Sequence, residues 1–499
     1  MMKPQYENYR YVGEICRLQN QSIVECRLPG SEISSILAIS AKAVPTEPVC
    51  ANGEVQYGGK VMLNIVYEDG EKKVCRAERG AEFFHKAEHG SVTPACFAKA
   101  VLSAENINYR REGSGLYLSV IVDADLTVYG NKQMDYVIGG DGLIARKENV
   151  SVCKTLCVSG ETEGEDEFET EYVGDILLHS ENAIVTRATA RAGQIDVEGE
   201  LVLHICALNS DETVSSYERL LPFQIQIPSD EAFGQVTAGA KVLVKSAYLT
   251  AGTDEEKGRS KIVFSYTLAA ECYLCVQEQF PIVDDAFCID RQIVLKKAKD
   301  RGRYLTNTFK CVERVSGTAA ISTPIDGEFT LQAAVLPRAE VVCRKGEQGY
   351  EAEGAVLADV LVKSADGNYR SVKLSLPFVF PIEGAGDWME ADALVCGLNV
   401  RRKKNGEMEA EGTVKLCMRA YEEREWEYVN AVEEGESYPI EKSAFSVFLP
   451  MEGEDLWQVS KRLGCAPEAL EKSNPDLEFP IKKGKKIYIY RQIAENLQK

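Results

Sequence analysis

An eleven-residue pattern occurs four times along the chain and is the strongest constraint on its fold. Apolar residues occupy alternate positions on both sides of a central glycine, at Gly59, Gly199, Gly354 and Gly412. The residues between them are mostly polar. Strict alternation over this length is typical of a strand with one buried face. A glycine at the same central place indicates a bend, a bulge or a close approach of two backbones. We therefore expect structural glycines rather than ligand contacts.

Two further runs, 116–126 and 262–272, alternate in the same way without the glycine. Taken by their centres, the six predicted strands pair as 59 with 120, 199 with 266 and 354 with 412. The first strands of successive pairs are 140 and 155 residues apart. The sequence therefore predicts a mainly β fold with three tandem antiparallel β-rich, sandwich-like domains. A chain of 499 residues is long enough for several separate cores.

The predicted boundaries of these domains are 1–165, 172–317 and 318–436, and a smaller module follows at 443–491. Between the first two domains lies the stretch 160–171, in which seven of twelve residues are acidic. A run of like charges is usually solvated, so this stretch predicts a linker or loop.

The charge balance excludes some classes of protein. The chain has 57 Lys+Arg against 77 Asp+Glu, a net charge of −20, whereas a nucleic-acid binder needs a basic face. No apolar run reaches the ~20 residues of a membrane span. The first residues, 1–7, lack the apolar core of a signal peptide. We expect a soluble cytosolic protein with no nucleic-acid partner and no membrane span.

The 16 cysteines are spread along the chain. Only Cys272 and Cys275 have the spacing of a metal knuckle or redox pair, and no second such pair follows at zinc-finger spacing. In a strand, residues three apart point to opposite faces, which is wrong for one metal. We expect reduced thiols that act as small core residues, because the cytosol keeps cysteines reduced.

One enzyme motif is present: His85-Lys86-Ala87-Glu88-His89 spells the H-x-x-E-H pattern of inverted zincins. That chemistry needs a helix, and this segment follows a predicted strand. In an extended chain His85 and His89 would be roughly 13 Å apart, too far for one zinc. The phosphate-binding G-x-x-x-x-G-K-[ST] loop and the G-x-S-x-G elbow are both absent. The expectation is a protein that is not an enzyme and needs no cofactor or metal.

The C-terminal residues follow a different pattern. A short apolar run at 445–449 precedes Leu456, Val459 and Leu463, which are spaced for one face of a helix. Gly464 is a stop signal, and Pro467 suits the first turn of a second helix. A last strand is expected at 486–490. Strand, helix, helix and strand in under fifty residues would form a compact βααβ unit.

These residues closely resemble a LysM domain. The similarity includes Gly453-Glu454-Asp455-Leu456-Trp457, Gly464, Pro467-Glu468-Ala469-Leu470, Asn474-Pro475-Asp476-Leu477 and Ile481-Lys482-Lys483-Gly484. LysM domains commonly bind N-acetylglucosamine polymers such as peptidoglycan, in a groove between the loop after the first strand and the loop before the second. The resemblance implies the following groove residues: Gly453, Glu454, Asp455, Leu456, Trp457, Asn474, Pro475, Asp476, Leu477 and Ile481.

This copy departs from the usual Gly-Asp-Thr-Leu of the family. Glu454 replaces Asp, and Asp455 replaces Thr. A Thr hydroxyl can donate a hydrogen bond to a sugar oxygen, whereas an ionised Asp can only accept one. The two adjacent carboxylates therefore predict an anionic rim. Hydrophobic packing in a very small core is the alternative role for Leu456, Trp457 and Leu470.

Three β-rich repeats with a Glu-Gly strand motif (Glu198-Gly199, Glu411-Gly412) and one C-terminal LysM resemble the clostridial spore-coat morphogenetic proteins of the SipL family, built of SPOCS repeats. The resemblance implies a non-catalytic scaffold in the mother-cell cytoplasm that gathers on the forespore surface and spore coat. Its LysM would contact the basement-layer ATPase of the coat, stage IV sporulation protein A. The alternative function is peptidoglycan binding through the LysM groove.

Overall fold

The computed structural model describes residues 2–29, 33–112, 115–171, 173–233, 236–254, 258–322, 328–346, 349–384, 386–403, 407–439 and 445–490. At the predicted domain boundaries, residues 1, 172, 443, 444 and 491 lie outside this set. Strands make up 81% of the structure and helices 3%, and every pairing between described strands is antiparallel. The prediction of a mainly β, antiparallel fold is confirmed. No helix of the described chain is long and apolar enough to cross a membrane.

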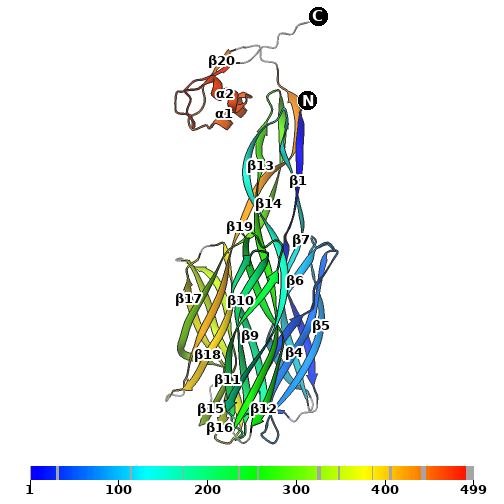
Figure 1. The fold of residues 1–499 in the computed structure, drawn as a ribbon, viewed down its shortest axis with the longest axis vertical. Helices are drawn as coiled ribbons and strands as arrows, with labels where there is room; N and C mark the ends of the chain where they lie inside the picture. The colour runs from blue at the N-terminus through cyan, green and yellow to red at the C-terminus, as the bar shows by residue number, and fades with distance from the viewer. Residues whose placement is uncertain are drawn as a thin grey trace.

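The strands form three successive two-layered units, which we call sandwiches (Figure 1), and in the third the two layers are parts of one six-stranded sheet. The first contains β1 (Lys3–Leu28), β2 (Ile33–Pro45), β3 (Val49–Ala51), β4 (Glu54–Asp69), β5 (Val74–Glu88), β6 (Phe97–Glu112) and β7 (Gly115–Asp141). The second contains β8 (Ile144–Glu171), β9 (Val173–Arg191), β10 (Gln194–Asn209), β11 (Val214–Pro228), β12 (Val236–Asp254) and β13 (Arg259–Phe287). The third contains β14 (Arg291–Ile321), β15 (Phe329–Gly346), β16 (Gly349–Ser364), β17 (Tyr369–Ile382), β18 (Trp388–Arg402) and β19 (Met408–Ser437).

The six alternating runs of the sequence are the central strands of these sheets. β4, β10 and β16 each lie between two neighbours in one sheet, and β7, β13 and β19 do so in the other. Their apolar faces meet inside each sandwich: Val61 and Val120 share one core, Leu201 and Phe264 a second, and Val356 and Val414 a third. In the third sandwich the two sheets also join at one edge, where Ala320 and Ile321 of β14 pair with β17.

The acidic stretch 160–171 is not a linker. It is the second half of β8, and it pairs with β13 from Glu171 opposite Arg259 to Gly160 opposite Ala270. Its glutamates alternate with half-buried residues such as Phe168, so the carboxylates lie on the exposed face of the sheet. Several are paired there, as Glu167 is with Lys261 at 2.7 Å. The prediction was wrong because the period-two alternation of this stretch, and not its charge, determines its structure.

Two long strands begin before the expected domain boundaries. β8 begins at Ile144 and belongs with β13, although the first predicted domain extended to 165. β14 begins at Arg291 and pairs with β19 along most of its length, although the second predicted domain extended to 317. In both cases the first strand of a sandwich follows the last strand of the preceding one after a very short connection, so the sequence contains no gap to mark the change.

Three of the four repeated glycines lie where backbones approach closely. A Cβ added to Gly59 would lie 2.3 Å from the carbonyl oxygen of Val44 on the neighbouring strand. At Gly199 the same distance to the oxygen of Ile184 is 2.3 Å, and at Gly354 the distance to that of Glu340 is 2.1 Å. No side chain fits at these distances. Gly412 differs, because the nearest atoms to its added Cβ are 3.5 Å away, an ordinary contact.

Beyond the sandwiches, the ends of β1, β7, β8, β13, β14 and β19 continue together as a narrow stalk (Figure 1). The stalk has its own core, to which all three pairs of strands contribute. Tyr11 and Met134 come from the first pair, Val152 and Ile282 from the second, and Trp426 from the third. Further along, Val137, Val283 and Val429 form a second small cluster. Each of these long strands is therefore buried twice, once in a sandwich and once in the stalk.

The three sandwiches also pack against one another in a shared buried cluster. Val66, Cys206 and Leu361 belong to one buried cluster, and they are separated by the same 140 and 155 residues as the repeated glycines. Equivalent positions of the three repeats thus pack together, as in a trimer made from one chain. The spacing of 140 and 155 residues is visible in the sequence, but the packing of the three repeats against one another is not.

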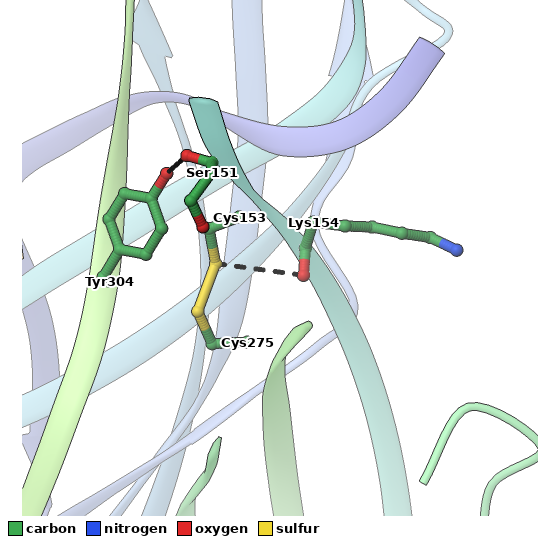
Figure 2. Close-up of a disulfide and its surroundings, with 5 residues drawn as sticks. All are labelled: Ser151, Cys153, Lys154, Cys275 and Tyr304. Carbon is green, nitrogen blue, oxygen red and sulfur yellow. Dashed lines mark hydrogen bonds between the residues drawn. A yellow bond between two sulfur atoms is a disulfide. The ribbon is translucent and has the colours of Figure 1, made fainter. Parts of the chain in front are cut away.

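Cys153 and Cys275 form a disulfide between β8 and β13, with their Cα atoms 5.8 Å apart (Figure 2). Tyr304 lies beside it and donates a hydrogen bond from its hydroxyl to the carbonyl oxygen of Ser151. The expectation that all thiols are reduced core residues is wrong for this pair, since the partner of Cys275 is distant in sequence and no spacing motif marks it. Cys272 is buried in the core of the second sandwich and remains a free thiol.

Gly354→Ala should lower the free energy of unfolding by about 1–3 kcal/mol, because the added methyl group has no space beside the Glu340 carbonyl oxygen. Gly412→Ala is the matched control: its methyl group has room, so the free energy of unfolding should stay the same or rise by up to about 1 kcal/mol. Urea denaturation followed by circular dichroism measures both. Equal midpoint shifts for the two variants would contradict the assignment of the close approach.

Candidate functional site: the C-terminal module and its dock on the stalk

Residues 445–490 form a small separate module. It contains β20 (Phe445–Phe448), α1 (Leu456–Leu463), α2 (Pro467–Ser473) and β21 (Ile487–Tyr490), and β20 pairs with β21. The core of the module is small and consists of the buried residues Val459, Leu470, Ile481, Ile487 and Ile489. Leu456, Leu463 and Leu477 are partly buried against it. The predicted apolar face of the first helix therefore packs inward.

Asp455 caps the start of α1. Its carboxylate accepts a hydrogen bond of 2.7 Å from the backbone N–H of Gln458, and the Gln458 side chain accepts one of 3.1 Å from the backbone N–H of Asp455. This reciprocal pair is a capping box, and a cap of this kind contributes about 1 kcal/mol to helix stability. Asp455, which replaces the usual Thr, therefore stabilises the start of α1.

The two predicted groove loops lie side by side and are joined to each other. The backbone N–H of Gly453 donates to the carbonyl oxygen of Ile481 at 2.8 Å, and the N–H of Ile481 donates to that of Glu454 at 2.9 Å. The Glu454 carboxylate accepts a hydrogen bond from the backbone N–H of Met451 and forms an ion pair with Arg462. These two amides are therefore already used, and the charge of Glu454 is balanced within the module.

The side chain of Asn474 anchors the second groove loop, which begins at this residue, to α2 and β21. Its side-chain amide donates to the carbonyl oxygens of Leu470 and Tyr488, and its oxygen accepts from the backbone N–H of Tyr488 at 2.7 Å. Asn474 is buried, whereas the next two residues, Pro475 and Asp476, are exposed. Of the ten predicted groove residues, those whose side chains or backbone face solvent are Gly453, Asp455, Pro475 and Asp476.

Trp457 does not pack in the core of the module, contrary to the alternative role given to it from the sequence. Its indole N–H donates a hydrogen bond of 2.8 Å to the carboxylate of Asp285, at the end of β13. The ring meets Phe287 edge-on, with 5.3 Å between ring centres, and the Arg146 guanidinium lies 5.6 Å from the ring centre. We call Arg146, Asp285 and Phe287 the stalk dock. Its partner is 172 residues away in the chain, so no local pattern could reveal it.

Asp285 also pairs with Lys461, one turn along α1 from Trp457, at 2.6 Å. Burial raises the pKa of the Asp285 carboxyl, but the Lys461 ammonium and the Trp457 N–H favour the charged form more strongly. The net result is a pKa below the ordinary aspartate value. One carboxylate thus holds two side chains of α1, and the module is seated on the stalk by its first helix (Figure 1).

The other sequence candidate, the pair His85 and His89, is not held by a helix. His85 is exposed on β5, and the ring of His89 accepts a hydrogen bond of 3.3 Å from the backbone N–H of Ser91. Across the described ranges, no group of three or more His, Cys, Asp and Glu side chains could hold a metal ion.

No protein-family model matches this chain, and neither a curated protein nor a solved structure matches it significantly. The interpretation of the module therefore depends on its residues and on their contacts.

Asp285→Asn should release the module from the stalk. The variant keeps the shape of the side chain but removes the charge that pairs with Lys461, a loss of about 1 kcal/mol because solvent screens the partly exposed lysine. Acrylamide quenching of tryptophan fluorescence measures the release, with Trp457→Phe identifying the contribution of Trp457. Quenching should increase in Asp285→Asn. The control Lys482→Gln breaks an exposed ion pair elsewhere on the module and should leave quenching unchanged.

The same contact should depend on pH in one direction. Because the pKa of Asp285 is lowered by docking, the stabilisation is complete above the ordinary aspartate value of 3.8 and is lost as the pH falls through the lower value of the docked state. Quenching of Trp457 should therefore be constant from neutral pH to about 5 and increase below 3.8. Asp285→Asn should lack this step. An identical acid step in the variant would assign the transition to other groups.

Proposed function

We propose that this chain is a non-catalytic scaffold of spore-coat assembly, with three tandem SPOCS-like domains and a C-terminal LysM domain. In this proposal it works in the mother-cell cytoplasm and gathers on the forespore surface, although the cytosol normally keeps a bond such as that between Cys153 and Cys275 reduced. The module docks on a basement-layer protein of the coat, an ATPase of the stage IV sporulation protein A type. The residues that resemble the SipL family support this proposal, as does a body built almost entirely of strands.

The seating of the module is the observation on which the proposal depends. One face of α1 is occupied by the stalk dock through Trp457 and Lys461. The loop that carries Pro475 and Asp476 is exposed. A module held at the end of a stalk, with one loop region presented to solvent, is suited to docking on another protein. We assign the docking surface to this exposed loop together with Gly453 and Asp455.

Peptidoglycan binding is the alternative. The two loops that would form the glycan groove do lie beside each other. Against a sugar ligand, the N–H groups of Gly453 and Ile481 are already used between the loops, and Asp455 presents a carboxylate that can only accept hydrogen bonds. Sugar hydroxyls also need hydrogen-bond acceptors, so the experiment below tests peptidoglycan binding as well.

Asp476→Lys is the sharpest variant for this test, since Asp476 is exposed and has no part in capping α1. Asp455→Lys would remove a helix cap at the same time. With the full chain as bait, Asp476→Lys should weaken capture of the purified basement-layer ATPase about tenfold, or roughly 1.4 kcal/mol. Glu471→Lys, which makes the same charge change on exposed α2, should bind normally.

Co-sedimentation with purified peptidoglycan separates the two functions. Retention on the sacculi that is lost in Asp476→Lys, without capture of the ATPase, would replace the scaffold proposal with the glycan alternative. Equal capture of the ATPase by Asp476→Lys and by the unchanged chain would contradict the assignment of the docking surface to this loop.

A further inference from the structure

A cavity of about 1120 Å³ lies where the three sandwiches meet below the stalk. Its walls come from all three of them, with Arg17 on β1, Tyr273 on β13 and Arg419 on β19 among the lining residues. Val342 and Arg301 also line it and are more than half exposed, so the cavity reaches the surface. It is distant in sequence from the module and has no part in the proposed docking function.

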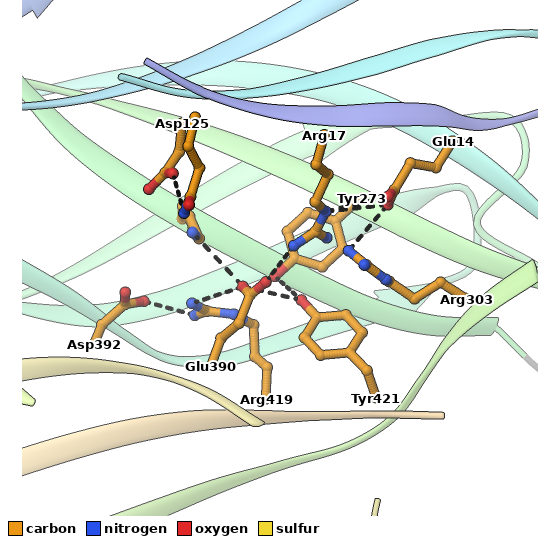
Figure 3. A network of polar contacts seen from close by, with 11 residues as sticks. Glu14, Arg17, Asp125, Tyr273, Arg303, Glu390, Asp392, Arg419 and Tyr421 are labelled. Atoms are coloured by element: carbon orange, nitrogen blue, oxygen red, sulfur yellow. Dashed lines mark hydrogen bonds and ion pairs between the residues drawn. The ribbon is translucent and has the colours of Figure 1, made fainter. Parts of the chain in front are cut away.

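Several polar side chains of the cavity are connected through Glu390 (Figure 3). Glu390 lies 2.7 Å from Arg17 and 3.7 Å from both Lys241 and Arg419. Arg303 pairs with Glu14 at 3.1 Å. The whole lining contains seven Lys and Arg residues and six Asp and Glu residues. The cavity is therefore not negative, although the chain as a whole carries a charge of −20.

Arg419 is the most unusual member, because its side chain is only 2% exposed. Its Nη1 donates to Asp392 at 2.6 Å. Its Nε and Nη2 are buried and have no hydrogen-bond partner among the described residues, and the nearest carboxylate to Nη2 is that of Glu390, in an ion pair at 3.7 Å. Leaving charged donors unsatisfied in a protein interior is costly. Nε and Nη2 point from the same edge of the guanidinium, which is the edge that binds two oxygens of one anion.

The residues around this edge are held in place. The Tyr421 hydroxyl donates to that of Tyr273 at 3.1 Å, and the Tyr421 ring stacks on Trp388 with 5.3 Å between ring centres. The Arg303 guanidinium lies 4.2 Å from the centre of the Trp388 ring. Tyr273 and Tyr421, which line the cavity together with Arg419, are therefore held by contacts of their own.

We propose that this cavity binds a small oxyanion, a phosphate or a carboxylate, on the Nε–Nη2 edge of Arg419. Two parallel charge-assisted hydrogen bonds would satisfy both orphan donors at once. The cavity is large enough for an organic phosphate or a dicarboxylate as well as for the inorganic ion, since ordinary ligand pockets measure ~300–1000 Å³. Phosphate and carboxylate share the chemistry that this edge recognises, so the experiment has one arm for each.

Isothermal titration calorimetry of the full chain with inorganic phosphate, and separately with succinate, tests the proposal. At least one anion should bind in a saturable manner, with a dissociation constant below about 1 mM. Arg419→Lys keeps the charge but removes the planar edge, so it should weaken binding about tenfold or more. Arg314→Gln is the control, because it removes an exposed arginine outside the cavity and should change nothing.

Glu390→Gln gives a second test with the opposite sign. It removes a carboxylate 3.7 Å from Arg419 and keeps that arginine, so binding should become several-fold tighter. If circular dichroism shows that Arg419→Lys does not fold, the change in anion affinity of Glu390→Gln tests the proposal instead. The proposal is overturned by an absence of saturable binding for both anions, by equal binding in folded Arg419→Lys, or by weaker binding in folded Glu390→Gln.

Discussion

The pairing of β7, β13 and β19 with their neighbours is the constraint on which the rest of the structure depends. Each of these strands lies in the core of a sandwich and then continues into the stalk, as β7 does from Leu118 in the first core to Met134 in the stalk. A residue slip in register would turn both apolar segments outward at once. The stalk, the central cavity and the dock for the module all follow from this shared register.

Ion pairs between the sandwiches help to fix how the three units are oriented relative to one another. Lys42 of the first sandwich pairs with Glu181 of the second, and Lys415 of the third pairs with Glu200 of the second. Pairs of this kind contribute little net stability, because the lost hydration offsets much of their attraction. Their geometry does select one arrangement of three similar units over others. The central network around Glu390 has the same consequence for the third sandwich.

The sequence predicts the local part of this structure well, because period-two alternation depends only on which side of a strand is buried. Six strands, three close glycines and the inward face of α1 follow from that argument. Other features did not follow from it. The acidic half of β8 alternates like any strand, but its charge masked the pattern. The packing of Val66, Cys206 and Leu361 and the seat of Trp457 both join residues more than a hundred positions apart, which a single sequence does not encode visibly.

The disulfide between Cys153 and Cys275 has a mechanical consequence. The bond spans 122 residues and encloses β9, β10, β11 and β12 completely. A pull applied to the two ends of the chain would pass from Cys153 directly to Cys275, and the residues between them would carry no tension. The second sandwich would therefore remain folded under a load that could open the other two, for as long as the bond is oxidised.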